Sequence, residues 1–326
     1  MSITLAKHFD PDLLTVASPL TRIPYISRAQ IEELARASRP AIFTGALEEW
    51  PARRKWRPEY FRDRWGTHAV DAYETTWSGN SPYASSEKEN SAQKSVTDFL
   101  DRATRDTDYA LYAHQIDAAE IFPGSLDDLG YAGMIDFLRI GPRFHPNVWM
   151  GTPGTRSGLH FDDAENLISM FYGIKAFMLV DPCSPRLLYP SRYCPSKSRI
   201  DPMRVDWSTF SRLQTAKIYI DVLQPGEMLF LPRKWWHYLA SLTLTINATC
   251  WFFWEGIDYP ESRSLFRPYV SYLFRCGPSY PLRFVYDFLW HGFLQRPYPM
   301  RALSPPPMGV QVWERLRNAR KLRADH

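Results

Sequence analysis

The chain has 326 residues, of which 45% are hydrophobic and 15% aromatic, and its formal net charge is +4. This hydrophobic content is ample for a folded core, and the small net charge argues against a nucleic-acid-binding protein. The cysteines have neither the paired spacing of a zinc site nor the density of a disulfide framework, which indicates a reducing compartment: Cys183, Cys194, Cys250 and Cys276. No apolar stretch is long enough to span a bilayer, and the first residues are too polar for a signal peptide. We therefore expect a cytoplasmic protein.

The N-terminal third contains two helix starts and one polar stretch. Ser27 followed by Gln30 is typical of a helix N-terminus, and Ser95 begins a second helix by the same logic. Residues 78–94 are polar and rich in turn formers, which predicts a mobile loop, either a surface insertion, which we favour, or a substrate lid. The triplet His8-Phe9-Asp10 has no strand or turn pattern around it, so we expect it to be disordered and not to bind a metal.

Apolar runs separated by turn residues dominate the middle of the chain and predict β-strands. Residues 154–158 indicate a turn, and residues 167–171 and 176–180 indicate two strands with a tight connection. Pro225-Gly226 precedes another short apolar strand, and a further strand covers residues 243–254. In that last strand Thr245, Asn247 and Thr249 share one face, because side chains alternate along a strand.

Two histidines and one aspartate in this β-rich region form a candidate metal site. His160 and Asp162 form a His-x-Asp pair after the predicted turn, and His237 follows two tryptophans about 75 residues later. Two imidazoles and one carboxylate can occupy one face of an iron(II) ion and leave the opposite face open. His237 alone could equally be a buried core histidine with satisfied ring nitrogens. We expect Asn247 to point into the same cavity as His237.

The order and spacing of these residues resemble a JmjC-type, cupin-like Fe(II)/2-oxoglutarate oxygenase, closest to the group of the asparaginyl hydroxylase that acts on hypoxia-inducible factor. The resemblance covers residues 109–254, with an earlier similarity at residues 39–56. It implies a mainly β double-stranded β-helix, or jelly roll, with helical additions. In this division residues 1–108 contain N-terminal helices and the strands leading into the fold, residues 109–256 the catalytic jelly roll, and residues 257–326 a C-terminal helical region.

The resemblance also implies roles for eight residues. Fe(II) would be bound by His160, Asp162 and His237, and the co-substrate 2-oxoglutarate by Lys175, Tyr112, Ser157, Asn166 and Asn247. Lys175 also stands in an apolar stretch where an unpaired ammonium is costly to desolvate, and a dianionic co-substrate would provide its partner. The alternative is a lysine that extends to solvent at a strand end. Because Ser157 and Ile168 depart from that hydroxylase, its asparaginyl specificity is not transferred.

The implied reaction decarboxylates 2-oxoglutarate to succinate and CO2 with O2 and hydroxylates an unactivated C–H bond. We expect a side chain of a protein or peptide to be the substrate. An oxygenase of a free amino acid or small metabolite is the alternative, because the loops around the barrel mouth decide between them. A JmjC demethylase ranks lower, since no reader domain or zinc-ligand cluster is present. A non-catalytic cupin-like binding protein ranks lower too, since it has no need of both the ligand set and Lys175.

The C-terminal region is predicted to be helical. Val312-Trp313, Leu316 and Ala319-Arg320 fall at helical spacing. The resemblance implies a homodimer formed through these helices, and a helix folded back on its own barrel is the alternative. The basic residues between 315 and 323 favour a solvated face over a nucleic-acid site.

Overall fold

The computed structural model describes residues 5–76, 91–105, 109–131, 133, 145–162, 164–182, 185–191, 196–252, 274 and 279–294. The chain divides into two compact units. The first unit comprises residues 1–182, 201–205 and 217–255, and the second comprises residues 183–200, 206–216 and 256–326. All strands of the described sheets lie in the first unit.

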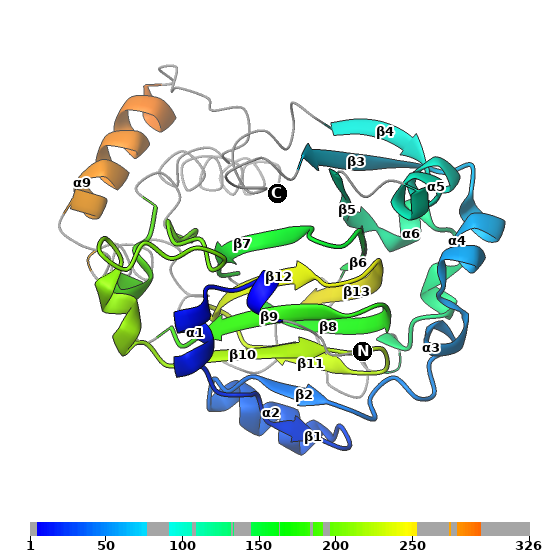
Figure 1. Cartoon of the computed structure of the whole chain (residues 1–326), viewed down its shortest axis with the longest axis horizontal. Helices are drawn as coiled ribbons and strands as arrows, with labels where there is room; N and C mark the ends of the chain where they lie inside the picture. Colours follow the sequence, from blue (N-terminus) through cyan, green and yellow to red (C-terminus); the bar gives the residue numbers. More distant parts are fainter. Residues whose placement is uncertain are drawn as a thin grey trace, which may run out of the picture. The chain divides into compact units, whose positions relative to one another are not determined.

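The first unit is built on two β-sheets (Figure 1). The larger has nine strands in the order β1 (Arg22–Ile23), β2 (Ala41–Phe43), β11 (Met228–Leu231), β8 (Glu165–Tyr172), β13 (Thr245–Phe252), β6 (His145–Gly151), β5 (Tyr109–Asp117), β3 (Ala69–Thr76) and β4 (Ser91–Ser95). The smaller has four strands in the order β10 (Ile218–Leu223), β9 (Lys175–Val180), β12 (Trp236–Ser241) and β7 (Arg156–His160). From β6 to β13 the chain passes repeatedly between the two sheets, and these strand pairs are antiparallel, which confirms the predicted mainly β jelly roll.

Short helices accompany the sheets. Those of the first unit are η1 (Leu5–Lys7), α1 (Pro11–Val16), α2 (Arg28–Arg36), α3 (Pro51–Lys55), α4 (Pro58–Trp65), α5 (Val96–Arg105), α6 (Ala118–Ile121) and η2 (Ser125–Asp127). The second unit contributes η3 (Pro185–Leu188), η4 (Ser211–Thr215), α9 (Ser279–Tyr286) and the π-helical turn η5 (Asp287–Phe293). Among the described residues, no helix has both the length and the apolar character needed to cross a membrane.

Both predicted helix starts are confirmed. Ser27 Oγ accepts a hydrogen bond from Gln30 N at 3.3 Å, and Gln30 Oε1 accepts one from Ser27 N at 2.9 Å, so a reciprocal capping box begins α2. At the start of α5, Ser95 Oγ accepts from Asp98 N at 3.0 Å. Each bond satisfies a backbone N–H that the first helical turn leaves without a partner.

Three local expectations were wrong. Residues 8–10 are ordered, because Phe9 is buried against Tyr238 and Asp10 caps α1. Residues 91–94 of the predicted loop form β4 together with Ser95, at the edge of the larger sheet, and an edge strand can be polar because one side faces solvent. Residues 78–90 lie outside the described residues. Residues 156–158 belong to β7, so the turn predicted over residues 154–158 is shorter. The predicted helix over residues 312–320 also lies outside the described residues.

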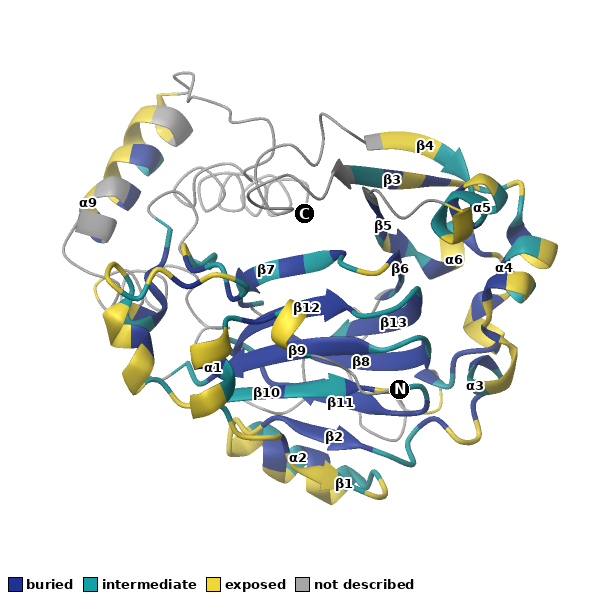
Figure 2. Cartoon of the chain, in the orientation of Figure 1, coloured by how far each residue is buried: buried dark blue, intermediate teal, exposed yellow. Residues whose placement is uncertain are grey.

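The core lies between the two sheets, where apolar side chains from alternate strand positions meet. Figure 2 shows the central strands as almost entirely buried. The inner row of β9 contains Phe177 and Leu179, and that of β8 contains Ile168 and Met170. Side chains alternate along a strand, so the residue two positions before each of these rows faces the same interior. On β9 this residue is Lys175, and on β8 it is Asn166.

Candidate active site

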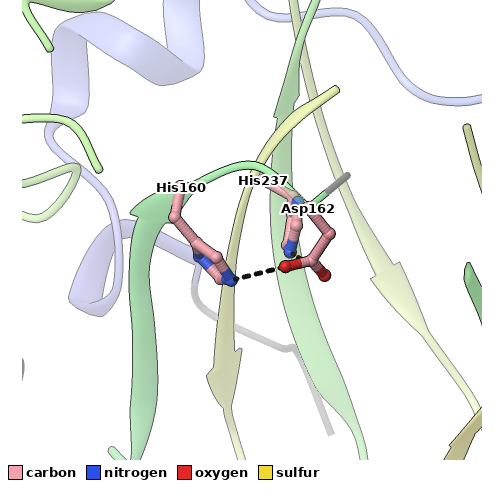
Figure 3. Close-up of side chains that lie close together, drawn as sticks. All are labelled: His160, Asp162 and His237. Atoms are coloured by element: carbon pink, nitrogen blue, oxygen red, sulfur yellow. Dashed lines mark ion pairs between the residues drawn. The ribbon is translucent and has the colours of Figure 1, made fainter. Parts of the chain in front are cut away.

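The three candidate metal ligands meet where β7 and β12 run side by side. His160 ends β7, His237 is the second residue of β12, and the two are directly paired in register, with ring centroids 4.1 Å apart. Asp162 follows β7 by two residues and turns its carboxylate toward both rings (Figure 3). Its Oδ1 lies 3.9 Å from His160 Nε2 and its Oδ2 lies 3.7 Å from His237 Nε2. Among the described residues, this is the one group of three side chains whose ligand atoms cluster tightly enough to hold a metal ion.

Backbone carbonyls orient both imidazoles. His160 Nδ1 lies 2.7 Å from Gly158 O, and His237 Nδ1 lies 3.0 Å from Trp235 O. A carbonyl oxygen only accepts, so each Nδ1 carries the proton and the lone pair of each Nε2 is the one that can bind a metal ion next to Asp162. Burial, and next the nearby His160, lower the pKa of His237 to about 4. A neutral imidazole is the form that binds a metal, so the residues present fit a divalent ion with imidazole and carboxylate ligands.

Lys175 is enclosed in the interior at a distance from these ligands. It is only 3% exposed, so the alternative of a lysine reaching solvent is wrong. Within the described part of the chain no carboxylate forms an ion pair with it, and burial lowers its pKa to about 7. Its Nζ lies 5.6 Å from the ring centroid of Tyr112 and 6.0 Å from that of Trp149. A buried ammonium of this kind is costly unless an anionic ligand pairs with it.

Two further predicted residues join Lys175. Tyr112 lies on β5, and its hydroxyl is 3.4 Å from Ser157 Oγ on β7. Tyr112 and Ser157 therefore place two hydroxyls beside the aromatic rings that surround the Lys175 ammonium. Two hydroxyls and one cation are well suited to bind a carboxylate.

The ligand triad and Lys175 are separated along the same strands. On β9, Leu179 pairs with His237, whereas Lys175 pairs with Ser241. Four residues of strand correspond to about 13 Å of backbone, and the inward-reaching side chains shorten the gap between their ends. A small extended dicarboxylate can therefore contact the metal with one end and Lys175 with the other.

Asn166 and Asn247 lie on the inner face of the larger sheet. Both side chains are buried, and the Oδ1 of each lacks a hydrogen-bond partner among the residues that the structure describes. Leaving a buried polar atom unsatisfied costs about 1 to 3 kcal/mol, so these oxygens indicate a place for water or a polar ligand. Among the described residues no hydrogen bond joins either amide to Lys175, so the structure places the two asparagines in the interior without tying them to the lysine.

Comparison with known proteins agrees with this arrangement. The sequence profile of the family described as "Cupin-like domain" matches residues 27–257. The chain belongs to this cupin-like family. Among curated proteins it is 29% identical over 268 residues to Jumonji C domain-containing protein 5 of Drosophila melanogaster, covering 74% of this chain and 63% of that protein. It is 26% identical over 250 residues to Lysine-specific demethylase 8 of Xenopus tropicalis (73% and 54%), and 28% identical over 262 residues to HSPB1-associated protein 1 of Bos taurus (70% and 51%).

The cupin-like profile and the names of these relatives agree with the JmjC-type resemblance of the sequence. JmjC proteins use Fe(II) and 2-oxoglutarate, and the His160, Asp162 and His237 cluster has the donor set for such an ion. The chain spans 51% to 63% of the length of the three relatives named above.

Sequence reasoning missed the hydrogen bonds that hold the cluster of His160, Asp162 and His237 in place. Trp251 Nε1 donates to Asp162 Oδ2 at 2.9 Å. Asp162 O accepts from Lys234 N at 2.8 Å, and the buried Glu165 accepts from Arg233 N at 2.9 Å. These two bonds attach the turn before His237 to the segment that carries Asp162. The alternation on β13 that identified Asn247 also places Trp251 on the inner face, so Trp251 could have been found from sequence.

An aromatic stack beside Lys175 was missed as well. The ring of His114 lies between those of Tyr73, at 4.7 Å, and Trp149, at 5.4 Å, both nearly parallel to it. Burial, and next the nearby Lys175, lower the pKa of His114 to about 4, so this ring is neutral at physiological pH. The stack therefore places uncharged aromatic rings next to the Lys175 side chain.

Proposed function

We propose that the chain is an Fe(II)- and 2-oxoglutarate-dependent oxygenase that hydroxylates a side chain of a protein or peptide. One observation carries the proposal: a two-histidine, one-carboxylate cluster shares an interior with a fully buried lysine that has no anionic partner among the described residues. The cluster suits the keto-acid end of 2-oxoglutarate with its metal, and the lysine suits the distal carboxylate.

In this proposal His160, Asp162 and His237 hold the iron, which supplies the activation of O2 that no amino-acid side chain provides. Lys175 binds the distal carboxylate of 2-oxoglutarate, with Tyr112 and Ser157 as hydroxyl donors beside it. Asn166 and Asn247 supply amide groups from the inner face of the larger sheet. The apolar rows between the sheets exclude water, which strengthens each of these polar contacts.

The names of the relatives support a protein substrate over a free metabolite. Of the three relatives named above, one is called Lysine-specific demethylase 8 and another HSPB1-associated protein 1. The first of these names makes a demethylase the second candidate. Demethylation of an N-methyl group begins with its hydroxylation, so the same residues serve both outcomes. The division into segments 1–108, 109–256 and 257–326 and a homodimer through the C-terminal helices remain part of the proposal.

The test is an anaerobic optical titration of the protein with Fe(II) and 2-oxoglutarate. The wild type is expected to develop the charge-transfer absorption of an oxoacid chelated to iron(II), and His237→Ala is expected to lack it. His8→Ala is the matched control, because His8 belongs to the chain's other His-x-Asp triplet and not to the metal cluster. A band in His237→Ala, or no band in folded wild type, would contradict the proposal.

Measuring succinate formation then distinguishes a protein or peptide substrate from a free amino acid. Protein extracts and peptide pools are compared with free amino acids under saturating 2-oxoglutarate, with His237→Ala as the blank. Mass increases of 16 Da on a peptide support the hydroxylase, and formaldehyde release from methylated peptides supports the demethylase. Turnover with free amino acids alone would reject a protein substrate.

A further inference from the structure

The Asp162 carboxylate is held unequally at its two oxygens. Oδ2 accepts the indole N–H of Trp251 at 2.9 Å, whereas Oδ1 has no hydrogen-bond donor among the described residues. Oδ1 faces His160 Nε2 and Oδ2 faces His237 Nε2, at the distances given above. Trp251 is half-buried on the inner face of β13, where it pairs with Asn166 of β8. The indole is therefore held by the sheet and directed at one oxygen of a metal ligand.

We propose that Trp251 is a positioning residue that keeps Asp162 a one-oxygen ligand, bound to the metal through Oδ1. The inference rests on the proposed function. A six-coordinate ion that binds two imidazoles and one carboxylate oxygen has three positions left. A chelating oxoacid takes two of them, and O2 needs the third. If both oxygens of Asp162 bound the metal, that third position would be filled. The indole N–H opposes this by competing for Oδ2.

A tryptophan outside the site provides a matched comparison. Trp65 ends α4, and its Nε1 donates to Pro123 O at 3.2 Å and not to a metal ligand. Replacing Trp251 or Trp65 by phenylalanine removes one hydrogen-bonded indole N–H and keeps an aromatic ring.

The experiment measures the open metal position directly. Wild type, Trp251→Phe and Trp65→Phe are loaded anaerobically with saturating Fe(II) and 2-oxoglutarate. Nitric oxide, a surrogate for O2, is then titrated while its complex is followed by electron paramagnetic resonance. Trp251→Phe is expected to bind nitric oxide about 10-fold more weakly than wild type, a typical effect of losing a partner of a metal ligand. Trp65→Phe is expected to match wild type, and Trp251→His, which keeps a ring N–H, is expected to recover part of the loss.

The outcomes separate this inference from the proposed function. If wild type shows no charge-transfer band, the proposed function fails. If wild type shows the band and Trp251→Phe binds nitric oxide equally well, or if Trp65→Phe loses as much affinity as Trp251→Phe, the role of Trp251 fails alone. Should Trp251→Phe not fold, hydrogen exchange in wild type loaded with Zn(II) and 2-oxoglutarate decides. The Trp251 indole N–H must then be protected, and exchange as fast as that of a free indole overturns the inference.

Discussion

The affinity for 2-oxoglutarate should fall steeply as the pH is raised from 7 to 9, because of Lys175. Without a ligand, burial holds the pKa of this ammonium at about 7. A bound carboxylate favours the charged form, so 2-oxoglutarate binds the protonated lysine. Both carboxylates of 2-oxoglutarate are ionised throughout this range, and His114, with a pKa of about 4, stays neutral. The protonation of Lys175 is therefore the dominant change in the lysine end of the site.

The magnitude follows from the fraction of protein that carries the proton. With a pKa of about 7, half of the lysines are protonated at pH 7 and about one in a hundred at pH 9. The apparent dissociation constant of 2-oxoglutarate should thus rise about 50-fold between these two values.

Isothermal titration calorimetry of Mn(II)-loaded protein measures this dependence without turnover. Lys175→Arg is the control, because a guanidinium stays charged up to pH 9 and its affinity should be nearly independent of pH. Any effect of pH on the metal or its ligands appears in both proteins. A wild-type dissociation constant that changes no more than that of Lys175→Arg would refute the assignment of Lys175 as the carboxylate partner.

Two further predictions concern stability. Folding lowers the pKa of Lys175 from 10.5 to about 7, so between these two values the unfolded chain holds more protons and the stability of the wild type rises with pH. Lys175→Met removes the cost of burying the charge, and in urea unfolding its stabilisation relative to wild type should be about 2 to 3 kcal/mol larger at pH 6 than at pH 9. A difference in unfolding free energy that does not depend on pH would contradict this. Gly173 has φ +75° in the turn between β8 and β9, and an added Cβ would clash with Leu244 O. Gly173→Ala should cost at least about 1 to 3 kcal/mol, whereas Gly133→Ala, with open space around its Cβ, should not; equal midpoints of thermal unfolding for the two variants would disprove the steric argument.

Local signals in the sequence predicted much of the fold correctly. The Ser27–Gln30 pair marks a helix start because its hydrogen bonds are made within four residues, whatever the rest of the chain does. Alternation placed Asn247 on an inner face, since the side-chain period of a strand is a local property. Where pairing with a distant segment decided the outcome, local signals failed: residues 91–95 look like a loop but pair with β3, and residues 8–10 are ordered by packing against Tyr238.

By itself the sequence determined the residue types of the candidate site: two imidazoles, one carboxylate and a lysine in an apolar strand, in an order that resembles the JmjC type. Only the tertiary structure decided how they meet. The register of β12 against β7 places His237 opposite His160, and the closing of two sheets over Lys175 removes it from solvent. The bond from Trp251 to Asp162 joins residues 89 positions apart. Such contacts depend on which strands pair and in which register, and the burial of the whole core sets this, which no local pattern contains.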